Sequence, residues 1–132
     1  MNLVVDTSVI IAVLVNEPDR KSIVRRTTGV DLIAPTSVHW EVGNALAAML
    51  KKGRMQKGQL QTVLAAYANI PIRFVDVDLT TSLEIAAEHN LYAYDAYIIA
   101  CARENYCRLI TLDKGLLEAA IKSRVEILEV DS

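Results

Sequence analysis

Short apolar runs alternate along the chain with longer stretches in which apolar residues recur every three to four positions. Five of the short runs are rich in β-branched residues and predict buried strands at 2–5, 32–35, 72–77, 109–112 and 125–130. The stretches between them predict helices at 8–17, 18–29, 36–52, 59–69, 82–89, 93–106 and 115–123. Strands that alternate with helices are typical of an α/β fold, in which helices cover both faces of a parallel sheet.

The first predicted strand ends on an acidic residue, in the stretch NLVVDTSVIIAVL at residues 2–14. Asp6 therefore falls on the turn between this strand and the helix that follows. Hydroxyl side chains are good N-caps, so Thr7 or Ser8 is expected to cap the helix. That arrangement would leave the Asp6 carboxylate free to bind a ligand.

Length and composition indicate a single compact domain, residues 1–132. A chain of 132 residues can bury a substantial core but is short for two domains, and a hydrophobic content of 52% argues against disorder. The apolar run at 9–15 is far shorter than the roughly 20 residues that span a membrane, and no basic leader precedes it. We therefore expect a cytoplasmic protein in which Cys101 and Cys107 form neither a disulfide nor a zinc site.

The net charge of −2 gives no global signal for nucleic-acid binding, so such binding would depend on local basic groups. Two groups of this kind occur, namely Arg20, Lys21, Arg25 and Arg26, and then Lys51, Lys52, Arg54 and Lys57. Solvated helix surface explains both groups equally simply, and the second can also complement a helix carboxyl end.

Four acidic residues stand in apolar surroundings where charge is costly. Asp6 and Asp113 each follow a predicted strand, whereas Glu41 and Asp95 lie within apolar helices. In doubly wound sheets, ligands bind beyond the carboxyl ends of strands where the strand order reverses. If the two strands are neighbours, these four carboxylates can meet in one cleft.

A cluster of this kind needs a counter-charge. Two carboxylates about 4 Å apart at an effective dielectric near 20 repel each other by about 4 kcal/mol, so either their pKa values rise or cations bind. Oxygen-only ligands suit Mg²⁺ or Mn²⁺. Such ions would polarise a phosphodiester, generate the attacking hydroxide and neutralise the leaving oxygen.

Each acid also has a purely structural interpretation. Asp6 and Asp113 can be N-caps of the helices that follow them, and Asp95 can complement a helix dipole. Glu41, flanked by Trp40 and Val42, would instead need a buried basic partner.

Four segments in order resemble the PIN-domain ribonucleases, in particular the VapC-like toxins of type II toxin-antitoxin pairs. These segments are VVDTSVIIAVL, APTSVHWEVGNAL, LYAYDAYIIACA and LITLDKGL. Together they run nearly from end to end of the chain. Members often carry Phe shortly after the last Asp, where this chain has Leu116 and Leu117.

The resemblance implies a three-layer α/β/α fold with a five-stranded parallel sheet. It also implies a Mg²⁺-dependent endoribonuclease that leaves a 5′-phosphate, forms homodimers and is inhibited by a small antitoxin. Carried over to this chain, the metal-binding carboxylates are Asp6, Glu41, Asp95 and Asp113. Thr111 would orient a bound water or Asp6, and Asn44 and Ser8 would border the pocket. The RNA backbone is expected at Lys51, Lys52, Arg54 and Lys57.

Other functions stay open. A metal-free ribonuclease would pair His39 with His89, but His39 lies about 200 degrees around its helix from Glu41. A phospho-aspartate phosphatase would need an acid where Ser8 stands, and a receiver domain would need two acids at the first strand's end. The remaining alternatives are a PIN nuclease that processes RNA without being a toxin, and an inactive metal-binding or RNA-binding module.

Overall fold

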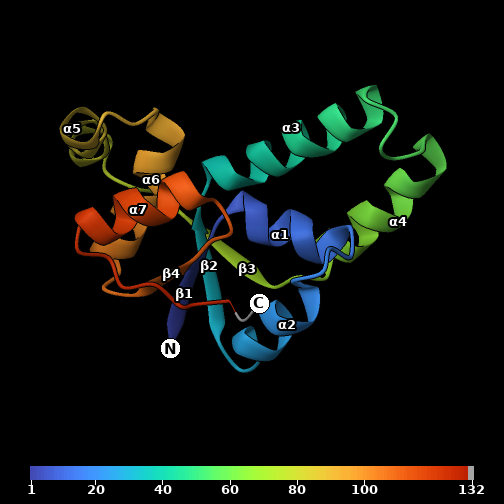
Figure 1. Cartoon of the computed structure of the whole chain (residues 1–132), viewed down its shortest axis with the longest axis horizontal. Helices are drawn as coiled ribbons and strands as arrows, with labels where there is room; N and C mark the ends of the chain where they lie inside the picture. The colour runs from blue at the N-terminus through green and yellow to red at the C-terminus, as the bar shows by residue number, and fades with distance from the viewer. Residues whose placement is uncertain (131–132) are drawn as a thin grey trace.

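The computed structural model describes residues 1–130 and forms one parallel sheet with helices on both faces (Figure 1). The strands are β1 (Asn2–Val5), β2 (Asp31–Pro35), β3 (Ile72–Val75) and β4 (Arg108–Ile110). The helices are α1 (Thr7–Leu14), α2 (Arg20–Thr27), α3 (Ser37–Lys51), α4 (Lys57–Ala68), α5 (Leu79–His89), α6 (Ala93–Glu104) and α7 (Lys114–Lys122). The α/β class expected from the sequence is confirmed.

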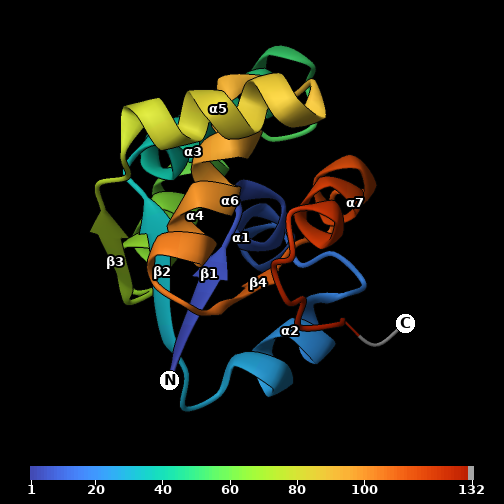
Figure 2. The same cartoon turned by 90° about the vertical axis from the view of Figure 1, so that its left-hand side faces the viewer.

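The strands lie in the order β3-β2-β1-β4, which Figure 2 shows from left to right. Leu3 of β1 pairs with Leu32 of β2 on one side and with Arg108 of β4 on the other. The strand order therefore runs outward from β1 to β3 and then reverses, with β4 on the free side of β1. This reversal creates a topological switch point between β1 and β4.

The expectation of a fifth strand at 125–130 is wrong for the described residues. This segment makes a single parallel bridge between Leu109 and Ile127. Two backbone hydrogen bonds hold it there, from Leu109 N to the Glu126 carbonyl and from Leu128 N to the Leu109 carbonyl. β4 has only three residues, so the segment 125–130 on its outer side finds few partners for a longer ladder.

Helices α5, α6 and α7 cover one face of the sheet, and α1 to α4 lie on the other (Figures 1 and 2). The core combines the buried faces of the strands with α6, in which Ile98 to Ala102 are all buried. Burial of this middle part of α6 explains why its sequence there is apolar on every side. No helix among residues 1–130 is both long and apolar enough to cross a membrane.

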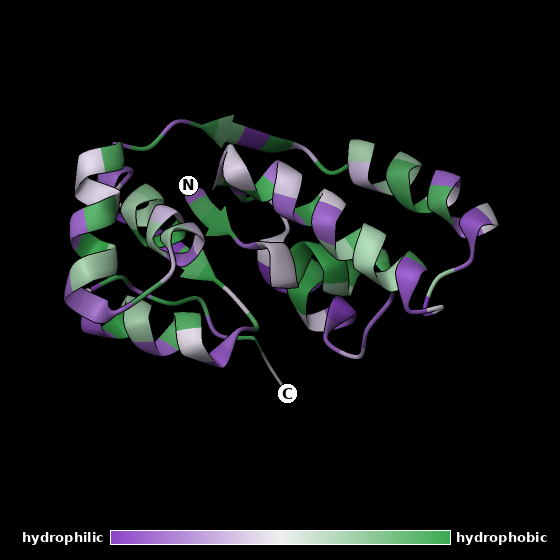
Figure 3. Cartoon of the chain, turned by 90° about the horizontal axis from the view of Figure 1, so that it is seen from above, coloured by the Kyte–Doolittle hydropathy of each residue, from purple (hydrophilic) through white to green (hydrophobic). Residues whose placement is uncertain are grey.

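Helices α3 and α4 form an arm that extends past the sheet (Figure 1). α4 has no buried residue, and the loop between the two helices is largely hydrophilic (Figure 3). Lys51, Lys52, Arg54 and Lys57 are all exposed around this tip. At 1.5 Å per helical residue, the ten residues from Glu41 to Lys51 place the tip about 15 Å along α3 from the acid.

Candidate active site at the carboxyl edge of the sheet

The four acidic residues stand at the edge of the sheet where the strands end. Asp6 directly follows β1, and Asp113 lies three residues after the end of β4. Glu41 and Asp95 are in the first two turns of α3 and α6. Figure 1 shows that α1, α3 and α7 begin at this same end of the sheet. The switch point between β1 and β4 therefore carries acidic side chains from both of its strands.

Both carboxylate oxygens of Asp6 accept hydrogen bonds from the protein. Oδ1 accepts from Ser8 Oγ at 2.7 Å and from Val9 N at 3.2 Å, while Oδ2 accepts from Thr111 Oγ1 at 2.6 Å. Asp6 is only 5% exposed, and burial raises the pKa of its carboxyl while these three hydrogen bonds oppose the rise. The charge of Asp113 raises the pKa further.

This geometry corrects the expected cap. Asp6, rather than Thr7 or Ser8, is the N-cap of α1, since its carboxylate accepts the Val9 amide. Ser8 instead donates its hydroxyl to Asp6 and accepts from Leu112 N at 3.0 Å. Ser8 thus joins the start of α1 to the loop after β4. Asp6 Oδ2, which accepts one hydrogen bond, still has a lone pair available for a further ligand.

Thr111 and Asp113 complete the connection on the β4 side. Thr111 Oγ1 accepts from Asp113 N at 3.0 Å while it donates to Asp6. Asp113 is the N-cap of α7, and its Oδ1 accepts from Leu116 N at 3.1 Å. The cap roles that the sequence allowed for Asp6 and Asp113 therefore exist. Capping directs both carboxylates at helix amino ends and holds them in place.

Glu41 lies on α3 with two of the other acids close enough to affect its ionisation. Its pKa is raised to about 7 by burial first, and then by the charges of Asp6 and Asp95. The Ser37 hydroxyl opposes this rise without forming a hydrogen bond of regular geometry. No basic side chain among residues 1–130 forms an ion pair with Glu41 within 4 Å, so the buried partner that a structural role would need is not found there.

The electrostatic couplings connect the four acids in a closed ring. Glu41 interacts with Asp6 and Asp95, and the charge of Asp113 raises the pKa of both Asp6 and Asp95. For Asp95, burial is the larger cause of its raised pKa. Asp6, Asp95 and Asp113 thus each destabilise the ionised form of a neighbouring acid, which is the condition that a bound cation relieves.

Three buried side-chain oxygens in the described chain lack a hydrogen-bond partner; one belongs to Glu41, one to Ser37, which interacts with Glu41, and one to Thr7, the residue after Asp6. They are Thr7 Oγ1, Ser37 Oγ and Glu41 Oε2. Buried polar atoms are normally paired, so orphaned atoms at one place indicate a site for water or an ion. Ser37 was not singled out from the sequence, and Thr7 was considered only as a helix cap. The spacing of four residues between Ser37 and Glu41, which places both on one helical face, was the signal available.

The donor set fits a hard divalent cation. All the available ligands are oxygens, and Mg²⁺ is commonly held by one or two carboxylates while it keeps several waters. Among residues 1–130, no three His, Cys, Asp or Glu side chains are grouped closely enough to hold an ion by themselves. A site built on one or two carboxylates at a time, with the orphaned oxygens nearby, does not require such a group.

Three other residues considered from the sequence have no bond to the acids within the described residues. Asn44 is exposed on α3, one helical turn after Glu41, and forms no hydrogen bond to the four carboxylates. His39 packs between α3, α4 and β3, with Nδ1 2.9 Å from the Tyr67 hydroxyl and its ring against Phe74. His89 lies at the end of α5 beside Glu88. The two histidines have separate partners, so a paired acid-base role for them loses support.

The model of the PIN domain family matches residues 3–122. Among solved structures, PAE2754 from Pyrobaculum aerophilum has a TM-score of 0.71 at 21% identity, covering 90% of this chain and 84% of its own. VapBC2 from Rickettsia felis, solved bound to a DNA fragment from its promoter, has a TM-score of 0.72 at 13% identity, covering 99% and 100%. FitAcB from Neisseria gonorrhoeae has a TM-score of 0.61 at 22% identity, covering 96% of each chain.

No curated protein matches the sequence. The identities to the three structures are low, so those likenesses concern the fold. The family model, in contrast, spans the sheet, the four acids and the helices that hold them. The chain therefore belongs to the PIN domain family.

Proposed function

We propose that the protein is a divalent-metal-dependent endoribonuclease that hydrolyses RNA phosphodiester bonds, and that it acts as the toxin of a toxin-antitoxin pair. PIN domains are generally nucleases, which gives the reaction class. The observation that carries the proposal is the ring of four coupled carboxylates at the switch point between β1 and β4.

Asp6, Glu41, Asp95 and Asp113 would hold the metal. When bound, Mg²⁺ or Mn²⁺ would supply Lewis-acid polarisation of the phosphodiester and stabilise the negative charge that develops in the transition state.

The protein's own groups prepare this site. Thr111 and Ser8 donate hydrogen bonds to Asp6, which favours its ionised form and fixes both of its oxygens. Glu41 has a pKa of about 7, so near neutral pH its carboxyl is close to half protonated without a cation. Its Oε2 accepts no hydrogen bond from the described residues and is available to an ion, a water or a proton.

The chemistry is tested by incubating purified protein with RNA and Mg²⁺, Mn²⁺ or EDTA, alongside the variants Asp6→Asn and Asp95→Asn. We expect cleavage with either metal, products with a 5′-phosphate, and loss of cleavage in EDTA and in both variants. Cleavage that persists in EDTA, or in both variants, would contradict the mechanism. RNA binding without cleavage under any metal condition would favour an inactive binding module.

The toxin role is a separate part of the proposal and rests on the resemblance of the four segments to VapC-like toxins, together with the likeness to VapBC2 and FitAcB. It implies an RNA substrate in the cytoplasm, a homodimer and a small antitoxin that covers the acidic cleft. Expression should arrest growth, the Asp6→Asn variant should not, and a small reading frame encoding an antitoxin should adjoin the gene. If neither arrest nor such a frame is found, an RNA-processing nuclease is the better interpretation.

A further inference from the structure

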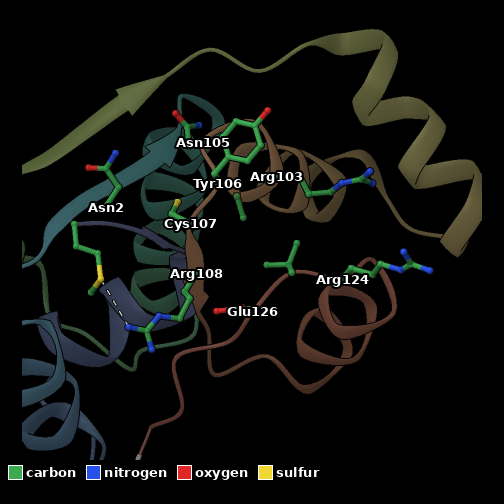
Figure 4. Close-up of a pocket in the computed structure, with 11 residues that line it drawn as sticks. Asn2, Arg103, Asn105, Tyr106, Cys107, Arg108, Arg124 and Glu126 are labelled. Carbon is green, nitrogen blue, oxygen red and sulfur yellow. Dashed lines mark hydrogen bonds between the residues drawn. The ribbon is translucent and has the colours of Figure 1, made fainter.

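A concave site lies at the opposite end of the strands from the acids. It is a hollow of about 710 Å³ formed where β1 and β4 begin and where α6 and α7 end (Figure 4). β1 separates the two sites, and at about 3.3 Å per residue Asn2 lies about 13 Å from Asp6. Pockets for small ligands commonly have volumes of about 300 to 1,000 Å³. The hollow is therefore large enough for a nucleotide.

Three arginines dominate the charge of this hollow. Arg103 comes from the end of α6, Arg108 from the start of β4 and Arg124 from just after α7. Figure 4 shows the side chains of Arg103 and Arg124 extending to one side of the hollow and that of Arg108 to the other. Within residues 1–130 none of these guanidinium groups forms an ion pair, and Arg108 contacts only the Met1 sulfur at 3.8 Å.

The negative charge around the hollow is smaller than the positive charge of the three arginines. Glu126 is the acidic residue in its lining, and the Met1 amino group is paired with Asp31 at 3.7 Å. The carboxyl ends of α6 and α7 each add about half a negative charge. Three guanidinium groups exceed the sum of these, so the hollow attracts an anion. Guanidinium groups match the geometry of phosphate especially well.

Two residues at the rim of the hollow adopt a backbone conformation that is unusual for bulky side chains. Tyr106 and Arg124 have φ values of 52° and 64°, a left-handed conformation that bulky residues rarely adopt. Both follow helices that end in the same way, with Cys107 N bonded to the Ala102 carbonyl and Val125 N to the Ala120 carbonyl. Glycine is the usual residue at this position of a helix end. The other two non-glycine residues with positive φ in the described chain are asparagines, which tolerate it.

We propose that this hollow binds a ribonucleoside phosphate, with Arg103 and Arg124 on one side and Arg108 on the other available to its phosphate groups, and the Tyr106 ring against the base. Tyr106 is 96% exposed, as a ring that stacks on a base must be before binding. The amides of Asn2 and Asn105 also line the hollow and can bond to base or ribose. An acidic peptide would use the arginines but would leave the exposed ring and these amides without a role.

The ribonucleoside phosphate can come from two sources, a free nucleotide or a segment of an RNA strand. Only the RNA source rests on the proposed ribonuclease function. The probes are therefore adenosine diphosphate, measured by calorimetry, and a fluorescein-labelled ten-nucleotide single-stranded RNA, measured by anisotropy. Both are measured in EDTA so that metal-dependent cleavage does not interfere. Binding of both probes that the variants below weaken identifies a nucleotide site, and binding of RNA alone that they weaken identifies a strand site.

The decisive variants are Tyr106→Gly and Arg124→Gly. Glycine adopts positive φ without steric cost, so both variants should keep or raise the melting temperature. Each should nevertheless weaken binding of the probe by about tenfold, because a stacked base or a guanidinium–phosphate contact is lost. Asn90→Gly, at φ 53° after α5, is the matched control and should change neither probe's affinity. A purely structural role would not give higher stability together with weaker binding.

The arginines are tested together in the triple variant Arg103→Gln, Arg108→Gln and Arg124→Gln. For single-stranded RNA, three lost phosphate contacts should reduce the slope of log affinity against log salt by about 2. Arg26→Gln on α2 is the charge control and should leave the slope unchanged. Three results would overturn the proposal. They are affinities within twofold of the wild type in all these variants, no binding of either probe, and binding of hexaglutamate in place of both probes. Asp6→Asn should abolish cleavage without changing adenosine diphosphate binding, so the two sites can fail independently.

Discussion

Thr111 donates a 2.6 Å hydrogen bond to Asp6 Oδ2 and so joins residues 105 positions apart in the sequence. Both side chains are buried, at 7% and 5% exposure. The bond connects the end of β4 to the end of β1, across the point where the strand order reverses. Burial raises the pKa of the Asp6 carboxyl, and the Thr111 hydroxyl is the strongest group that opposes this rise.

Replacing Thr111 with valine keeps the shape of the side chain and removes the donor. We expect the Asp6 pKa to rise, so RNA cleavage should fall at least tenfold near neutral pH and recover partly at higher pH. The unfolding free energy should fall by about 1 to 3 kcal/mol, because a buried carboxylate loses a partner. Thr111→Ser keeps the hydroxyl and is the control. Wild-type cleavage by Thr111→Val across the pH range would show that the hydroxyl does not support Asp6.

Asp6→Asn should separate activity from stability. The amide keeps an oxygen for the Ser8 hydroxyl and the Val9 amide and offers an N–H to Thr111 Oγ1, so the hydrogen-bonded positions remain filled. It also removes a charge that Glu41 and Asp113 oppose. The metal-free variant should therefore melt at the same or a higher temperature while losing cleavage, as expected for an active site that is costly to the fold.

Asp113→Asn tests the same trade-off on the β4 side, where the amide can still cap α7. A large fall in melting temperature for either variant would mean that these acids serve mainly as caps. Circular dichroism melts and cleavage assays on the same preparations make the comparison direct.

Much of the fold could be predicted from the sequence because its signals are local. The apolar run before Asp6 forms β1, and the regular apolar spacing in the stretch ending at Lys51 forms α3. The region at 125–130 has the same alternation but forms one bridge at Ile127. Its outcome depends on the length of β4, its neighbour, which a local pattern does not contain.

The candidate site likewise has some features that the local sequence predicts and others that it does not. The four acids were identifiable because charge in an apolar context is unusual. The exchange of roles between Ser8 and Asp6 was not predictable, because Ser8 also bonds to Leu112, more than 100 residues away. Either residue can cap a helix by local rules. Tertiary contact decides which one does so, and here it makes Asp6 both a cap and a ligand candidate.

Glu41 should make the stability of the metal-free protein depend on pH. Its pKa rises from 4.5 in the unfolded chain to about 7 in the fold, so the folded state binds the proton more tightly. Below pH 4.5 both states are protonated and there is no penalty. As pH rises from 4.5 to about 7, the unfolded state loses the proton first and folding stability falls. Because the side chain is only half-buried, solvent screening limits the loss to about 1 kcal/mol.

Glu41→Gln should remove the Glu41 contribution and leave the smaller dependence on the raised pKa values of Asp6 and Asp95, whereas Glu118→Gln, on an exposed part of α7, should leave all of it. Mg²⁺ should bind better as pH rises through 7, because the cation requires ionised carboxylates. The rise in melting temperature on adding Mg²⁺ should therefore be larger at pH 8 than at pH 6. Equal shifts at the two pH values would mean that Glu41 does not contribute to the metal site.

The basic tip of the α3–α4 arm gives the last prediction. Lys51, Lys52 and Lys57 are exposed there, and Lys51 is about 15 Å along α3 from Glu41 at 1.5 Å per residue. Replacing all three with glutamate should weaken binding of long RNA and reduce its salt slope by about 2 if each contacts one phosphate. A dinucleotide substrate is too short to reach the tip, so its cleavage rate should not change. Glutamate at Arg20, Lys21 and Arg26 on α2 gives the same change in charge at another surface and should have a smaller effect. Equal effects of the two triple variants would mean that the lysines act only through net charge. Unchanged RNA binding would mean that the three lysines are ordinary solvated surface residues.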